Sequence, residues 1–509
     1  MRSARNAEHK MIKGDPIMKY YSTRDVNQES FDSAYVIKKG LASDSGLFVP
    51  ESIPEITKDE ILSLCEKTYP ERAAYVLSKF LTDYTYDELL SDCKEAYCEE
   101  SFPGGAAPLN KINDNIYSLE LWHGPTAAFK DMALQIMPRL LSRALVKTGE
   151  ENTALILVAT SGDTGKAALE GYKDVDRVKI MVFYPVDGVS KVQKLQMATQ
   201  TGSNVNVCAI KGNFDDAQNG VKKIFADDVA KEKLLENGYI LSSANSINWG
   251  RLAPQIVYYI SAYCDLLAKG DIAFGDKINV CVPTGNFGNI FAAYIAKLMG
   301  LPIDKLICAS NANNVLTDFL RTGTYDRNRD FHLTMSPSMD ILISSNLERL
   351  LFFTAGAEKT AAYMKQLNAE GNYTVEDEIK ELIGKNFIGY YADEIETAKT
   401  LSDFYRDYGY LADTHTSVAL NCAQKYLNES GDNKKIVVAS TASPYKFAAD
   451  VYKSITEKDA SADTGALGDL SALTGTEITY PLRNLAQRKI NFDKVINKDD
   501  MLEEVYTFM

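Results

Sequence analysis

Short apolar runs that alternate with helical patterns constrain the fold of this chain more than any other feature. Two groups of runs are present, at 154–160, 179–185 and 204–212 and then at 278–284, 305–311 and 434–441. Helical patterns follow the first two runs, in TGKAALEGY and SKVQKLQMATQ. Such alternation predicts parallel sheets with crossover helices. The two groups therefore predict an α/β protein with two open lobes, in which ligands lie at the carboxyl ends of the strands.

Patterns on either side of these runs predict the remaining domain organisation. Residues 1–17 are polar and aperiodic, so we expect a disordered extension there. Apolar residues at helical spacing follow, and residues 18–105 are predicted to form an N-terminal helical domain. The large α/β domain is expected at 106–149 and 261–509, with a helical insertion at about 322–400, and the small α/β domain at 150–260.

Length, charge and cysteine content exclude several classes of protein. The chain has 509 residues, of which 45% are hydrophobic and 24% charged, as in soluble proteins with several domains. No apolar run approaches the length of a membrane span, and the N-terminus lacks the apolar core of a secretory signal. A net charge of −14 argues against a nucleic-acid partner. Because the eight cysteines are scattered, we expect free thiols and no metal site. Together with the lack of a membrane span and of a secretory signal, this predicts a cytoplasmic protein without a membrane partner.

The segment VPTGNFGNIFAAYIAKLMG (282–300) combines an apolar strand, a glycine-rich turn and an amphipathic helix that begins near Asn289. Backbone N–H groups and the positive end of the helix dipole favour an anion at such a turn. The spacing matches neither the dinucleotide-binding nor the Walker pattern, which favours the phosphate of a smaller cofactor. A glycine-rich turn without a ligand is the alternative.

A second strand-to-helix loop lies in ATSGDTGKAALEGY (159–172). Ser161, Asp163 and Thr164 surround the free N–H groups of a helix start, which is a suitable seat for a carboxylate or phosphate. The loop is not a Walker motif, because Lys166 is followed by alanine and nothing would bind magnesium. An ordinary capped helix would produce the same pattern.

Lys130 stands in LELWHGPTAAFKDMALQIMPRLL (119–141), between a strand-like start and a helical pattern. Its neighbours Ala128, Phe129 and Met132 suggest a partly apolar pocket, which would lower the pKa of the amine and favour Schiff-base chemistry. A lysine taken alone is more often a surface residue.

These segments resemble, in the same order, those of the threonine synthases, which are pyridoxal-phosphate enzymes of fold type II. The resemblance extends over nearly the whole chain from Met18 and includes YYSTR, GLASDSGLFVPESIP, HGPTAAFKD, TSGDTG, NSINWGR (245–251), PTGNFGN, SPSMDI (336–341), DTHTSVA (413–419) and STASPYKF (440–447). It implies two open α/β lobes with a helical N-terminal unit, and pyridoxal 5'-phosphate as the cofactor.

The resemblance also implies a role for each candidate site residue. Lys130 would hold the cofactor as a Schiff base, the GNFGN turn would bind its phosphate, and Thr441 would face the pyridine nitrogen and leave it unprotonated. Cofactor contacts are thus expected from Lys130, Gly285, Asn286, Phe287, Gly288, Asn289 and Thr441. Substrate contacts are expected from Ser161, Gly162, Asp163, Thr164, Asn248 and Arg251, although a structural ion pair is an alternative for the arginine.

The implied activity converts O-phospho-L-homoserine and water into L-threonine and phosphate by γ-elimination and β-addition, the last step of threonine biosynthesis. A serine/threonine dehydratase, a phospho-amino-acid lyase and a non-catalytic cofactor-binding protein are the alternatives. Three positions depart from the family: Ser443 and Thr414 replace the usual histidine and proline, and Trp122 stands where phenylalanine is common. The change at Ser443 puts phosphate binding or proton transfer near the pyridine nitrogen in doubt.

Overall fold

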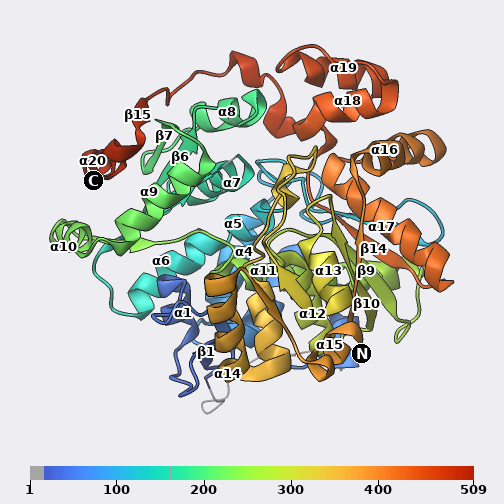
Figure 1. Cartoon of the computed structure of the whole chain (residues 1–509), viewed down its shortest axis with the longest axis horizontal. Coiled ribbons are helices and arrows are strands. Elements are labelled where there is room, and N and C mark those ends of the chain that lie inside the picture. Colours follow the sequence, from blue (N-terminus) through green and yellow to red (C-terminus); the bar gives the residue numbers. More distant parts are fainter. Residues whose placement is uncertain (1–16, 161, 188) are drawn as a thin grey trace, which may run out of the picture.

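The computed structural model describes residues 17–160, 162–187 and 189–509, and its two open sheets lie apart, the larger in the right half of Figure 1 and the smaller at the upper left. The larger sheet has six strands in the order β13-β10-β9-β14-β4-β3. Its strands are β3 (Leu109–Lys111), β4 (Ile116–Glu120), β9 (Ile278–Pro283), β10 (Ile303–Ser310), β13 (Phe387–Tyr391) and β14 (Ile436–Ser440). All neighbours are parallel except β3 and β4. Strands β4, β9 and β14 are buried along their whole length, and the apolar runs predicted β9 and β14.

The smaller sheet is parallel throughout, in the order β15-β7-β6-β5-β8. Its strands are β5 (Thr153–Ala159), β6 (Val178–Pro185), β7 (Val205–Lys211), β8 (Tyr239–Ser242) and β15 (Val495–Asn497). The first three correspond to the predicted apolar runs. Strand β15 comes from the end of the chain and pairs with β7, although the predicted boundaries assign that segment to the large domain.

The N-terminal unit is helical, with a small antiparallel pair of strands. It contains β1 (Tyr20–Ser22), α1 (Ser33–Lys39), β2 (Phe48–Pro50), α2 (Lys58–Cys65), α3 (Tyr69–Phe80) and α4 (Tyr86–Ala96). Capping boxes start α2 and α4, where Thr57 and Thr85 exchange hydrogen bonds with Glu60 and Glu88. The predicted disordered extension lies outside the described residues, except for Ile17.

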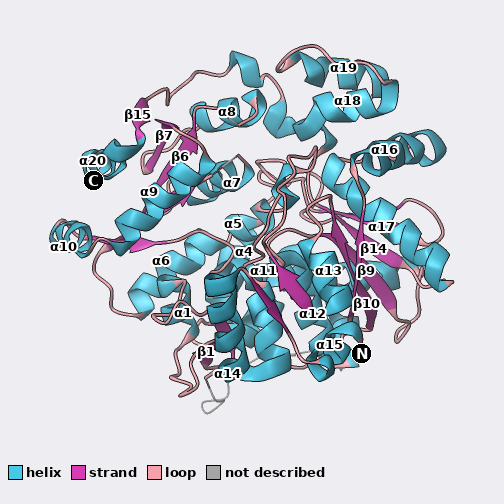
Figure 2. Cartoon of the chain, viewed as in Figure 1, coloured by secondary structure: helices cyan, strands magenta, loops and turns pink. Residues whose placement is uncertain are grey.

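Helices cover both faces of each sheet (Figure 2). Between β4 and β9 the structure has α5 (Asp131–Leu134), α6 (Met137–Lys147), α7 (Asp163–Tyr172), α8 (Lys191–Ala198), α9 (Phe214–Ala226), α10 (Asp228–Glu236) and α11 (Trp249–Lys269). After β9 follow α12 (Gly288–Leu298), α13 (Val315–Thr322) and α17 (Thr414–Ser430). In the described part of the chain, none of the helices combines the length and apolar composition needed to cross a membrane.

The segment predicted as a helical insertion at about 322–400 is only partly helical. It contains α14 (Leu347–Glu370), α15 (Asp377–Gly384) and α16 (Glu394–Tyr408), together with β11 (Thr324–Asp326), β12 (Asn372–Thr374) and β13. Strand β13 extends the larger sheet by pairing with β10. Gly389 permits this arrangement, since a Cβ atom there would lie 2.8 Å from the Cα of Thr317 on α13.

The C-terminal segment runs from the large lobe to the small lobe, across the top of the view in Figure 1. It consists of η2 (Pro444–Phe447), α18 (Ala448–Thr456), α19 (Gly465–Thr474), η3 (Tyr480–Leu482), η4 (Leu485–Gln487), β15, η5 (Lys498–Asp500) and α20 (Met501–Phe508). An ion pair between Asp463 and Lys191 on α8, at 2.5 Å, joins the segment to the small lobe.

Candidate active site

Lys130 follows β4 in a turn that is fixed by its own side chains and by the strand beside it. The backbone N–H and the hydroxyl of Thr126 donate to the Asp131 carboxylate at 2.8 and 2.6 Å. Burial raises the pKa of that carboxyl to about 6. The N–H of Phe129 donates to the carbonyl of Thr441, beyond the end of β14, at 2.8 Å. These contacts place Lys130 and Thr441, two predicted cofactor contacts, on adjoining segments.

The amine of Lys130 lies in a buried and electrostatically mixed environment. Its side chain is 12% exposed, and its Nζ lies 3.8 Å from the Oδ2 of Asp163. Burial lowers the pKa of Lys130, the nearby cations of Lys446 and Arg251 lower it further, and Asp163 opposes them. A lowered pKa increases the neutral fraction of the amine, which is the form that reacts with a carbonyl carbon.

The predicted phosphate turn connects β9 to α12 and is held by uncharged groups. The Ser344 hydroxyl donates to the carbonyl of Gly285 at 2.7 Å, and the N–H of Asn346 donates to the carbonyl of Asn286 at 3.0 Å. Phe287 has a left-handed backbone with a φ of 61° and starts the helix at Gly288. A Cβ atom on Gly285 would lie 2.7 Å from the carbonyl oxygen of Ser338, so the close packing of this turn requires glycine.

Asn289 has a donor available for a ligand at the N-terminus of α12. Its Oδ1 accepts hydrogen bonds from the hydroxyls of Tyr258, at 2.7 Å, and Tyr259. Its Nδ2 is buried and has no partner among the residues that the structure describes. A buried donor without a partner is costly, and a bound phosphate would satisfy it. The turn therefore fits a phosphate group.

The small-lobe loop is organised around two acceptors, the Thr160 hydroxyl and the Asp163 carboxylate. The N–H groups of Gly162 and Gly165 both donate to the Thr160 hydroxyl at 3.0 Å. The Asp163 carboxylate accepts from Lys446 Nζ at 2.9 Å and from Gln193 Nε2 at 2.8 Å. The nearby lysines hold its pKa well below the usual range despite burial. Thr164 lies in the first turn of α7, whereas Ser161 lies outside the described residues.

Asn248 and Arg251 have different functions at the start of α11. Asn248 caps the helix by accepting from the N–H of Gly250 at 2.9 Å, and its amide donates to the carbonyl of Ile37 at 2.9 Å. The guanidinium of Arg251 is 3% exposed and donates to the carbonyl of Ala244. Its Nε is unpaired within the described chain, and burial lowers its pKa to about 10. A buried cation of this kind fits an anionic ligand.

Ser443, the position that departs from the family pattern, contacts the C-terminal segment. Its hydroxyl lies 2.5 Å from that of Thr479 and accepts from the N–H of Tyr445 at 3.3 Å. The side chain thus caps η2, which carries Lys446. Near the end of β14, the Trp122 indole donates to the Ser440 hydroxyl at 3.0 Å.

The site contains residues to which the sequence analysis gave no role. His415 accepts the N–H of Ser338 on its Nε2 at 3.1 Å, and its Nδ1 lies 3.0 Å from the carboxylate of Asp413. Lys446 and Gln193 both bind Asp163. Ser338, His415 and Lys446 belong to the motifs SPSMDI, DTHTSVA and STASPYKF, whose resemblance to the family could have marked them as site residues. Gln193 belongs to no such motif.

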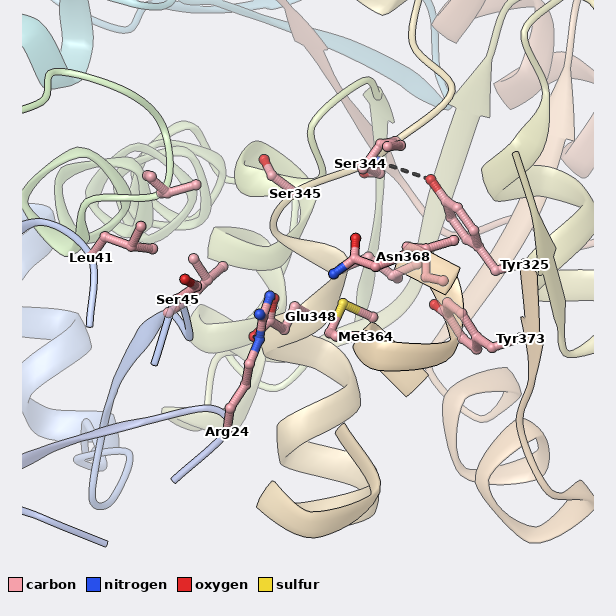
Figure 3. A pocket seen from close by; sticks show the side chains of 15 residues that line it. Arg24, Leu41, Ser45, Tyr325, Ser344, Ser345, Glu348, Met364, Asn368 and Tyr373 are labelled. Atoms are coloured by element: carbon pink, nitrogen blue, oxygen red, sulfur yellow. Dashed lines mark hydrogen bonds and ion pairs between the residues drawn. The ribbon is translucent and has the colours of Figure 1, made fainter. Parts of the chain in front are cut away.

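A separate cavity of about 220 Å³ lies beside the segment that supports the phosphate turn (Figure 3). The Tyr325 hydroxyl accepts the N–H of Ser344 at 2.8 Å on one wall, and Arg24 pairs with Glu348 at 2.7 Å on another. Residue Ser344 therefore contacts both this cavity and the turn at Gly285.

Comparisons with known proteins identify the family. Residues 19–97 match the family model "Threonine synthase N terminus", and residues 104–442 match "Pyridoxal-phosphate dependent enzyme". Threonine synthase of Pseudomonas aeruginosa is 40% identical over 433 residues, which cover 84% of this chain and 89% of that protein. This chain belongs to the threonine synthase family. Its members are pyridoxal-phosphate enzymes, and the turn at 285–289 and the amine of Lys130 fit that cofactor.

Solved structures confirm the predicted fold type II architecture. Threonine synthase from Brucella melitensis, solved with pyridoxal phosphate bound, matches with a TM-score of 0.85 and 36% identity, over 96% of this chain and 99% of that chain. The yeast threonine synthase matches with a TM-score of 0.86 and 30% identity, over 97% and 99%. Human threonine synthase-like 1 is 38% identical over 483 residues, which cover 92% of this chain but only 64% of that longer protein.

Proposed function

We propose that this chain is a threonine synthase that converts O-phospho-L-homoserine and water into L-threonine and phosphate. The observation that carries the proposal is the buried Arg251, whose Nε has no partner within the described chain. The amine of Lys130 and the turn at 285–289 account for the cofactor and its phosphate. Arg251 therefore supplies a further cation, as a substrate with its own phosphate requires.

The residues of the site act on the bound substrate in distinct ways. Pyridoxal phosphate, when bound, supplies the conjugated ring that stores electrons while bonds at the substrate carbons break. Lys130 Nζ would hold the cofactor, and its free amine would carry protons between the α and β carbons of the substrate. Arg251 holds the substrate phosphate, and the N–H groups at the start of α7 orient the substrate carboxylate. Thr441 would present a neutral hydroxyl to the pyridine nitrogen of the cofactor.

Product analysis tests this proposal against its rivals. The purified chain with added pyridoxal phosphate should form threonine and phosphate in equal amounts from O-phospho-L-homoserine, without 2-oxobutyrate. Release of 2-oxobutyrate from threonine would instead indicate a dehydratase. A preparation that binds the cofactor and turns over neither compound would indicate a non-catalytic binding protein.

The attachment site is tested by borohydride reduction of the loaded protein followed by peptide mapping. We expect the reduced adduct on Lys130 alone, and a Lys130→Ala variant should lose the cofactor absorbance and at least ~10³-fold of turnover. A Lys166→Ala variant is the matched control, because this buried lysine pairs with Glu170 at 2.8 Å. An adduct on another lysine would overturn the assignment.

We also propose a cytoplasmic location. All eight cysteines lie in the described chain as free thiols, which agrees with a reducing compartment. Isolation of the native protein with an intact disulfide would contradict this placement.

A further inference from the structure

Lys446 is a completely buried lysine to which the mechanism above gives no role. It lies on η2, just beyond β14, and its side chain is 0% exposed. Its Nζ lies 2.9 Å from the Oδ1 of Asp163 and donates to the carbonyl of Thr126 at 2.9 Å. One ammonium group therefore joins three segments: its own, the small-lobe loop and the turn that carries Lys130.

Asp163 is shared between two lysines. Its Oδ1 contacts Lys446 at 2.9 Å, whereas its Oδ2 faces Lys130 at 3.8 Å. The Gln193 amide donates to Oδ1 at 2.8 Å, and the Ser338 hydroxyl donates to Oδ2 at 3.4 Å. The bond to Lys446 is the shorter of the two lysine contacts. It directs one carboxylate oxygen away from Lys130 and leaves the other beside it.

We propose that Lys446 is a positioning residue that keeps Asp163 ionised and partly neutralised, so that the carboxylate orients Lys130 without holding it in the protonated state. A carboxylate with no other cation would pair fully with Lys130 and make the amine a poor nucleophile. An uncharged residue at 163 would leave Lys130 without a nearby negative charge to orient it. Sharing the carboxylate between two lysines avoids both outcomes.

The charged groups that act on Lys130 come from four elements, and their effects on its pKa have definite signs. Asp163 on α7 and Asp131 on α5 raise the pKa of Lys130, whereas Lys446 on η2 and Arg251 on α11 lower it. Burial lowers it most. Removal of Lys446 takes away one lowering influence and leaves the charge of Asp163 to Lys130 alone. Both changes raise the pKa of Lys130.

The test measures the reactivity of Lys130 in the cofactor-free protein, where no turnover is needed. Acetic anhydride labels neutral amines, so peptide mass spectrometry across a pH series gives the midpoint at which Lys130 becomes reactive. In Lys446→Met we expect this midpoint to rise by about one pH unit, as one nearby charge commonly produces. Lys446→Arg, which keeps the charge, should restore the midpoint of the unchanged protein.

Two further variants separate positioning from simple stabilisation. Lys166→Met removes a different buried lysine, which lies on α7, and we expect it to lower the melting temperature without moving the Lys130 midpoint. Asp163→Asn should move the midpoint the opposite way, to lower pH, because Lys130 then loses its nearest carboxylate. If Lys446→Met does not fold, the Lys130 midpoints of Lys446→Arg and Asp163→Asn still test whether the charges at 446 and 163 control the reactivity of Lys130.

A Lys446→Met variant with a lower melting temperature and an unmoved midpoint would overturn the inference, as would an Asp163→Asn variant with an unmoved midpoint. The inference rests on the proposed function only in taking Lys130 as the cofactor lysine. Absence of threonine formation in the unchanged protein, together with a shifted midpoint in Lys446→Met, would refute the substrate assignment and leave the role of Lys446 standing.

Discussion

The turn at 285–289 and the loop at 162–165 have the same local design, but neutral groups hold the first and charged groups hold the second. Each connects a buried parallel strand to a helix through glycine. Ser344, Asn346 and two tyrosines hold the first through neutral hydrogen bonds. The second contains an ionised Asp163 bound by Lys446. A strand, a glycine turn and a helix thus define where a ligand group can lie, whereas residues distant in sequence define its charge.

This difference explains why the small-lobe loop is not a simple anion site. The negative charge of Asp163 opposes an anion at the start of α7, so a nearby cation must compensate. Lys446 pairs with Asp163, and the Nε of Arg251 has no partner among the described residues, which is the basis for proposing it as the substrate cation. The large-lobe turn needs no such compensation, because its unpaired donor on Asn289 is neutral.

The largest expected effect comes from breaking the charged loop itself. Asp163→Asn should lower the free energy of unfolding by about 3 kcal/mol at neutral pH, because it leaves Lys446 buried without its carboxylate. The pKa of Asp163 is depressed in the folded protein, so its contribution to stability is present above the unfolded pKa of about 3.9 and is lost as pH falls below it. Denaturant unfolding should therefore show the gap between the two proteins narrowing below about pH 4. A gap that is constant with pH would show that Asp163 is not ionised.

Arg251→Met is expected to raise KM for O-phospho-L-homoserine about 100-fold while changing the melting temperature little. The variant removes a buried cation that has no carboxylate partner among the described residues, so folding loses little. Steady-state kinetics and thermal unfolding measure the two quantities. Arg72→Met is the control, since Arg72 on α3 of the N-terminal unit pairs with Asp265 on α11 at 2.6 Å and should show the reverse pattern. Equal loss of stability in both variants would argue that Arg251 is structural.

Gly285→Ala and Gly162→Ala should show which of the two loops binds the cofactor. A Cβ on Gly285 meets the backbone oxygen of Ser338 at 2.7 Å, so we expect about tenfold weaker cofactor binding, equivalent to a loss of 1.4 kcal/mol. A Cβ on Gly162 meets the side chain of Gln193 at 2.4 Å and would disturb the substrate loop. Absorbance titration with pyridoxal phosphate should show weaker binding only for the first variant. Equal weakening would mean that both loops hold the cofactor.

The smallest effect concerns the support of the phosphate turn. Ser344→Ala removes the 2.7 Å bond to Gly285 and should weaken cofactor binding about threefold, within the range of one neutral hydrogen bond. Ser345→Ala removes only two long contacts of 3.4 Å, with the side chains of Asn286 and Asn346, and should change nothing measurable. The same absorbance titration compares them. A larger effect at Ser345 would show that the support of the turn is distributed differently.

The strands and the two turns could be predicted because their information is local. Apolar runs of β-branched residues and glycines before helices marked β5, β6, β7, β9, β10 and β14 correctly. Strand β13 was missed inside a charged, helix-like stretch, and β15 was missed because its pairing with β7 depends on a segment almost 300 residues away. The alignment of Lys446, Asp163 and Lys130 likewise joins residues from three separate regions.

The sequence alone determined that apolar strands end at two glycine turns and that a lysine with apolar neighbours stands between a strand and a helix. These features follow from backbone geometry and side-chain size, which act between near neighbours. The tertiary structure decided which charges meet there. Asp163 is paired with Lys446, the Nε of Arg251 has no partner among the described residues and Asn248 caps a helix, because electrostatic partners are chosen by distance in space and by burial.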